Sequence, residues 1–174
     1  MFSRTNTSVK AALYGLVLII FYLLQSVPAL SLRFMNVSPE LLLVLAICVA
    51  YNESETFAAF FGLIVGIIND TVTDGVVGKS ALFFMFASFM VAVLLKTVLR
   101  RLFLTYVVIE LCAIALFLIV EYVLILVFFG NMPLSLCLAK VILPKFLFSA
   151  ALCYPVYYVI RFLNRKLDAG GVEL

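Results

Sequence analysis

Histidine and tryptophan are absent from this chain of 174 residues, and charged residues make up only 12% of it. Without histidine, the usual zinc sites and histidine-based acid–base catalysis are excluded. The four cysteines lack CxxC spacing, which argues against a disulfide framework and a cysteine-based metal site. The glycine pattern of a phosphate-binding loop and a nucleophile elbow are missing as well. The sequence therefore predicts no metal, no cofactor and no enzyme activity.

Apolar side chains, in contrast, make up 67% of the residues. A soluble domain usually has about 45–50% apolar residues and about 25% charged ones, so a globule of this length could not bury so many. Lipid must solvate them, and continuous apolar runs favour helices over barrel strands, which would alternate. We expect one all-α integral membrane domain over residues 1–174. The net charge of +3 comes from basic residues at predicted helix ends, so no nucleic-acid partner is expected.

The apolar runs, separated by polar turns, predict six transmembrane helices. Helices 2 and 3 are expected to be short, because about 13 residues at 1.5 Å each span about 20 Å, against a hydrocarbon core of about 30 Å. Ser38 is a candidate N-cap of helix 2, and Pro39 suits its first turn. Pro144 and Pro155 are candidate positions for a break in helix 6. The expected ranges are Ala11–Val27, Pro39–Tyr51, 57–69, Ser80–Leu95, Phe103–Phe129 and Leu134–Leu163.

Lysine and arginine positions predict that both chain ends are cytoplasmic. With the N-terminus inside, eight of the 12 basic residues lie on the cytoplasmic side. The four on the opposite side are Arg33, Lys79, Lys140 and Lys145. The turn between helices 2 and 3 carries Glu53 and Glu55 instead of a base, but acidic residues contribute little to orientation. An alternative for the start is a signal peptide cleaved near residues 27–29, which would leave five helices.

Small residues recur every fourth position from Ala58 through Gly62 and Gly66 to Asp70. Residues four apart share one helix face, so helix 3 presents a small-residue groove that ends in a carboxylate. Such a groove lets another helix approach closely. One interpretation is an internal packing seam, and the other is a docking face for a partner's helix. Asp70 could cap a helix and brace the following loop, or it could contact a partner.

Two carboxylates, Glu110 and Glu121, interrupt the apolar run of helix 5. An ionisable residue inside a membrane is normally paired or functional. If helices 5 and 6 form a hairpin about Pro133, Glu121 and Lys145 lie equally far from the turn and therefore at similar depth. We expect them to form a structural ion pair; a proton or substrate relay is the alternative. Glu110 lies nearer the cytoplasmic face, within reach of Arg100 or Arg101 if their side chains extend along the helix.

Three segments form a further pattern: Ser38-Pro39-Glu40-Leu41-Leu42-Leu43, then the run from Gly62 to Asp70, then Gly78 before helix 4. Together they resemble the MreD family of small bacterial inner-membrane proteins. Chain length, helix count and the basic loop between helices 4 and 5 are also similar to that family. The acidic turn between helices 2 and 3 departs from it, because a basic turn would be expected there.

The resemblance implies a non-enzymatic scaffold of the rod-shape machinery, which builds lateral peptidoglycan. Such a protein is expected in the bacterial inner membrane, bound to the bitopic protein MreC and working with MreB, RodA and an elongation transpeptidase. A partner-binding role carries over to Pro39, Gly62, Gly66, Asp70 and Gly78 as a hypothesis. The alternative is a substrate-binding subunit of an energy-coupling-factor vitamin transporter, which has a similar size and helix count. Such a subunit needs a ligand cavity lined by several polar or aromatic groups, and few polar residues occur in these helices.

Overall fold

The computed structural model describes residues 4–26, 39–72, 78–97, 103–129 and 142–169. In this part of the chain all regular structure is helical, which confirms the predicted all-α class. Helices α3, α4, α5 and α7 are long and apolar enough to cross a membrane, and α2 and the apolar part of α1 are shorter. The bounds are α1 Arg4–Ser26, α2 Leu41–Asn52, α3 Glu55–Val72, α4 Lys79–Thr97, α5 Phe103–Phe129 and α7 Leu143–Ala169.

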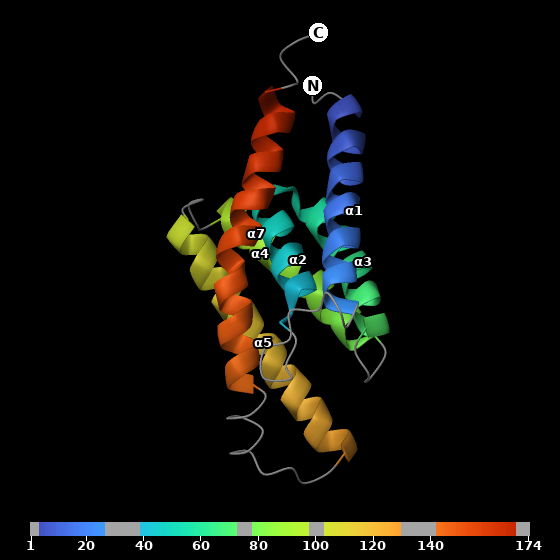
Figure 1. The fold of residues 1–174 in the computed structure, drawn as a ribbon, viewed down its shortest axis with the longest axis vertical. Helices are drawn as coiled ribbons and strands as arrows, with labels where there is room; N and C mark the ends of the chain where they lie inside the picture. The colour runs from blue at the N-terminus through green and yellow to red at the C-terminus, as the bar shows by residue number, and fades with distance from the viewer. Residues whose placement is uncertain (1–3, 27–38, 73–77, 98–102, 130–141, 170–174) are drawn as a thin grey trace.

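Helix α2 is the centre of the bundle. Its 12 residues are apolar around the whole circumference up to Tyr51, and a helix of that kind must be buried on every side. Accordingly, all residues from Leu41 to Tyr51 are buried, and α2 contacts α1, α3, α4, α5 and α7. The other helices surround it (Figure 1). The bundle is therefore built around a short helix that has no surface left for lipid.

The surrounding helices expose large apolar side chains on their outer faces. Examples are Ile19 of α1, Phe60 of α3, Leu82 of α4, Leu116 of α5 and Leu147 of α7, each more than half exposed. In water such a surface would be unfavourable, whereas hydrocarbon solvates it without cost. The beginning of α1 and the end of α7 lie at the same end of the bundle (Figure 1), as the predicted common side of the two chain ends requires.

Several predicted helix features need correction. Helix α1 begins at Arg4 and not at Ala11, and the last helix, α7, ends at Ala169 and not at Leu163. Helix α3 has 18 residues, about 27 Å of helix at 1.5 Å each, so it is not short. Helix α2 begins at Leu41, which places Pro39 before the helix and not in its first turn. Helix α7 runs unbroken through Pro155, as membrane helices tolerate where neighbouring groups compensate the missing N–H. Ser38 and residues 134–141, where helix 6 was expected to begin, lie outside the described residues.

Candidate functional site: a charge network at one end of the bundle

Four charged side chains form a connected group that we call the charge network: Glu40, Lys79, Glu121 and Lys145. Lys145 Nζ lies 2.6 Å from Glu40 Oε1 and 2.8 Å from Glu121 Oε2. Lys79 Nζ lies 3.2 Å from Glu121 Oε1. Glu40 is almost fully buried and the other three side chains are at most 16% exposed. Two carboxylates thus face two ammonium groups, and the network is neutral as a whole.

Each member of the charge network comes from a different part of the fold. Glu40 directly precedes α2, Lys79 is the first residue of α4, Glu121 lies in α5, and Lys145 lies in the first turn of α7. The positive end of a helix dipole stabilises an acid and disfavours a base. Both lysines therefore sit at unfavourable helix ends, which increases their need for the carboxylates. The backbone N–H of Glu40 also donates to Ser149 Oγ at 3.0 Å, a second tie to α7.

The predicted pair of Glu121 and Lys145 is present, but it is part of a larger group than the sequence indicated. Glu40 and Lys79 were not identified as its members. The predicted topology contained a hint of both, because it placed Lys79, Lys145 and the start of helix 2, where Glu40 lies, at the same membrane surface. The sequence did not show which of these ends are neighbours in space, so only the hairpin pair could be assigned.

The first turn of α4 is bound by the side chain of Asp70. Asp70 Oδ2 accepts the backbone N–H of Gly78 at 2.9 Å and that of Ala81 at 3.3 Å, and Oδ1 accepts that of Ser80 at 3.0 Å. These donors have no partner within their own helix. A carboxylate from the end of α3 thus caps α4. This is the capping alternative for Asp70, and the carboxylate is engaged within the chain instead of facing a partner.

A row of buried polar side chains joins three helices beside this cap. Gln25 Nε2 of α1 donates to Asn69 Oδ1 of α3 at 3.1 Å, and Asn69 Nδ2 donates to Ser80 Oγ of α4 at 3.1 Å. Asn69 and Ser80 are fully buried. Ser80 follows Lys79, so the first turn of α4 connects this row to the charge network. Nothing in the periodicity of the sequence marked Gln25 or Ser80, because their role depends on helix neighbours.

The small-residue groove of α3 is occupied by α4. A Cβ atom added to Gly66 would lie 2.5 Å from Ala81 Cα, and one added to Gly62 would lie 2.6 Å from the Phe84 carbonyl oxygen. The backbones approach so closely that only glycine fits. The groove is the internal seam, so the docking hypothesis for Gly62 and Gly66 is not retained.

Gly78 and Pro39, the remaining candidate partner-binding residues, also have positions explained by the fold. Gly78 has a φ of 92°, which residues with a side chain rarely adopt, and its backbone N–H donates to Asp70. Pro39 is buried before α2, next to Glu40 of the charge network. Pro39 is therefore part of the packing of this end of the bundle, and Gly78, which is partly exposed, is the residue through which the chain enters α4.

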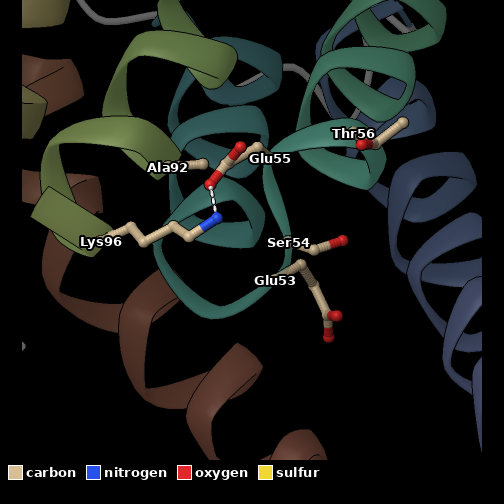
Figure 2. Close-up of a pocket in the computed structure, with 6 residues that line it drawn as sticks. All are labelled: Glu53, Ser54, Glu55, Thr56, Ala92 and Lys96. Atoms are coloured by element: carbon tan, nitrogen blue, oxygen red, sulfur yellow. Dashed lines mark ion pairs between the residues drawn. The ribbon is translucent and has the colours of Figure 1, made fainter. Parts of the chain in front are cut away.

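The opposite end of the bundle carries a hollow of about 340 Å³ between the α2–α3 turn and α4. Figure 2 shows its lining, in which Lys96 extends towards Glu55. Lys96 Nζ lies 2.6 Å from Glu55 Oε1, with the lysine side chain 73% exposed. Glu53 Oε1 accepts the Tyr14 hydroxyl of α1 at 2.8 Å. The two acids of this turn, which departed from the expected basic turn, are thus used as contacts to α4 and α1.

A second hollow, of about 470 Å³, lies between α4 and α5. We call it the apolar groove. No side chain in its lining carries a nitrogen or an oxygen atom, and the one sulfhydryl group belongs to Cys112. Because it lies between two helices that are apolar enough to cross a membrane, the acyl chains of lipids match its chemistry. It offers no polar group that could orient a hydrophilic ligand.

The charge network connects segments that are distant in sequence. Each ammonium group of the network contacts a carboxylate that comes from another segment of the fold. Among the described residues, no three potential metal ligands gather at one place. Comparisons of the chain with protein-family models, curated proteins and solved structures give no match.

Proposed function

We propose that this chain is a non-enzymatic scaffold of the bacterial cell-elongation machinery. In this proposal it resides in the inner membrane with both ends in the cytoplasm and binds a bitopic, MreC-like protein. The proposal starts from the likeness to MreD in the segments around Pro39, from Gly62 to Asp70, and at Gly78. Through that partner the chain would be connected to MreB, RodA and an elongation transpeptidase.

The scaffold proposal rests on the contacts that the buried polar groups make at the end of the bundle with the charge network. The charge network joins α2, α4, α5 and α7, and the polar row joins α1, α3 and α4. These two sets of contacts tie all six described helices at one end. The polar groups that make these contacts are engaged within the chain, which favours a structural role over catalysis. A bundle whose helices are joined in this way and whose outer face is apolar suits a protein that works by binding other membrane proteins.

A vitamin-binding transporter subunit is supported less well. A ligand site needs a cavity with a few placed polar groups, and the apolar groove between α4 and α5 has none in its lining. The hollow at the other end has an acidic and basic lining, but it opens beside the exposed Lys96 side chain. Neither hollow resembles an enclosed site for a small polar molecule.

The decisive experiment is affinity purification of the tagged chain from native bacterial membranes in a mild detergent. Mass spectrometry should find an MreC-like bitopic protein enriched over a control purification with an unrelated membrane protein of similar helix count. A vitamin that co-purifies in stoichiometric amount, without such a partner, would support the transporter alternative. Absence of both would contradict the scaffold proposal.

The contact face can be mapped in the same membranes, because each outer helix offers an exposed apolar position. A photoreactive residue can replace Ile19, Phe60, Phe86, Leu116 or Leu147, each at least half exposed. Cross-linking to the partner from one or two adjacent helices is expected. Equal cross-linking from all five positions would indicate random collision and would count against a specific scaffold.

A further inference from the structure

Glu110 of α5 is an acidic residue that the charge network does not include. It is fully buried and lies seven residues after Phe103, which is about 10 Å along the helix axis. Both of its carboxyl oxygens lack a hydrogen-bond partner within the described part of the chain. Arg100 and Arg101, the partners considered from the sequence, lie outside that part. The carboxyl group therefore stands apart from every described cation.

The groups around Glu110 come from three helices and offer little stabilisation for a negative charge. The Tyr106 hydroxyl lies beside it, one turn earlier on α5, and is itself buried without a hydrogen bond. Cys48 of α2 and Cys153 of α7 are close enough to interact with it electrostatically. Thiols are weak donors, so a single hydroxyl is the strongest donor among these neighbours.

Arg161, a basic residue of α7, is directed to an aromatic side chain. Arg161 Nη1 lies 3.3 Å from the Tyr157 hydroxyl, and its guanidinium carbon lies 5.8 Å from the centre of the Tyr157 ring. Tyr157 in turn packs on Tyr106, with ring centroids 4.7 Å apart. Arg161 thus contacts Tyr157, and the structure, which describes both residues, gives no ion pair between this arginine and Glu110.

An ionised carboxylate without a partner in such surroundings is very costly, and a buried group of this kind takes up a proton instead. We propose that Glu110 is an intramembrane proton-binding site, whose carboxyl group carries an exchangeable proton at neutral pH. The ligand is the proton itself. A protonated Glu110 is a donor and can pair with the Tyr106 hydroxyl, which satisfies two buried groups at once. Glu121 is the opposite case, because two ammonium groups compensate its charge.

Infrared spectroscopy of the full chain in lipid tests this proposal. At neutral pH the wild-type protein should show the C=O stretching band of a protonated carboxylic acid, and Glu110→Gln should remove it. Transfer to D2O should shift the band, since the proton exchanges. Glu121→Gln is the matched control on the same helix and should remove carboxylate bands instead. Loss of carboxylate bands in Glu110→Gln, or a band that does not shift in D2O, would overturn the proposal.

A second measurement keeps the proposal testable if Glu110→Gln does not fold. A hydrophobic carbodiimide reacts with protonated carboxyl groups in membranes, and mass spectrometry identifies the modified residue. We expect modification of wild-type Glu110 that declines as the pH is raised, with Glu121 unmodified throughout. Modification of Glu121 in preference to Glu110, or no modification of Glu110 at any pH, would overturn the assignment.

Discussion

The ammonium group of Lys145 lies 2.6 Å from Glu40 Oε1, so the residue before the central helix is tied directly to the first turn of α7. The same ammonium group contacts Glu121 of α5 at 2.8 Å. One lysine therefore connects three segments that are distant in sequence. Because lipid supplies no hydrophobic drive for helix association, such contacts and close packing must hold the bundle together.

Lys145→Met should be the most destabilising single change in the charge network. It leaves the buried Glu40 without its ammonium partner and Glu121 with Lys79 alone, and breaking a buried pair typically costs about 3–5 kcal/mol in soluble proteins. Lys79→Met should cost less, because Lys79 has one carboxylate partner, at 3.2 Å. Thermal unfolding in detergent would give this order. An equal loss for both lysines would contradict the central position of Lys145.

The double variant Glu121→Gln/Lys145→Met should be more stable than the sum of the two single losses indicates, because it leaves one acid and one base in the network. Strict additivity would mean that the two residues are not coupled. Lys96→Met is the matched control. It removes an ion pair of similar length at the exposed end, and exposed pairs are worth about 0–1 kcal/mol.

Sequence patterns predicted those features that depend on one helix at a time. The bounds of α5, Phe103–Phe129, agree with the prediction because a long apolar run lies between Arg101 and Gly130. The length of α3 was underestimated because Asn69 and Asp70 looked like the end of a helix. Their side chains form hydrogen bonds with the first turn of α4, which allows α3 to continue to Val72. Contacts between non-consecutive helices, such as Glu40 with Lys145, left no periodic signal.

Gly66→Ala should destabilise the fold, because the new Cβ would lie 2.5 Å from Ala81 Cα and neither backbone can yield without moving a helix. Overpacking of this kind costs about 1–3 kcal/mol, occasionally more, and Gly66→Leu should cost more again. Gly15→Ala is the matched control, since a Cβ there meets nothing within 4 Å. Equal melting temperatures for Gly66→Ala and Gly15→Ala would contradict the α3–α4 seam.

Asp70→Ala should also lower stability, which makes it unsuitable as a structurally silent probe of partner binding. It leaves three backbone N–H groups at the start of α4 without their acceptor, and loss of a helix cap costs about 0.5–2 kcal/mol. Asp70→Asn keeps one acceptor oxygen and should lose less. Thr71→Ala, which removes only an exposed local hydrogen bond to Ile68, should have little effect. The order Ala, Asn, wild type in melting temperature checks the capping role.

The orientation in the membrane can be tested at the two ends of the α3–α4 pair. Thr97, next to Lys96, marks the end with the acidic hollow, and Thr71, near the Asp70 cap, marks the end with the charge network; both side chains are exposed. With cytoplasmic chain ends, Thr97→Cys should react with a membrane-impermeant maleimide only after the membrane is opened. Thr71→Cys should react in intact cells. The unsubstituted chain gives the background from its native thiols, of which Cys48 and Cys153 are buried. Labelling of Thr97→Cys in intact cells, with Thr71→Cys protected, would reverse the orientation. It would place the charge network at the cytoplasmic surface. A partner that binds from outside the cell membrane would then meet the hollow lined by Glu53, Glu55 and Lys96 instead.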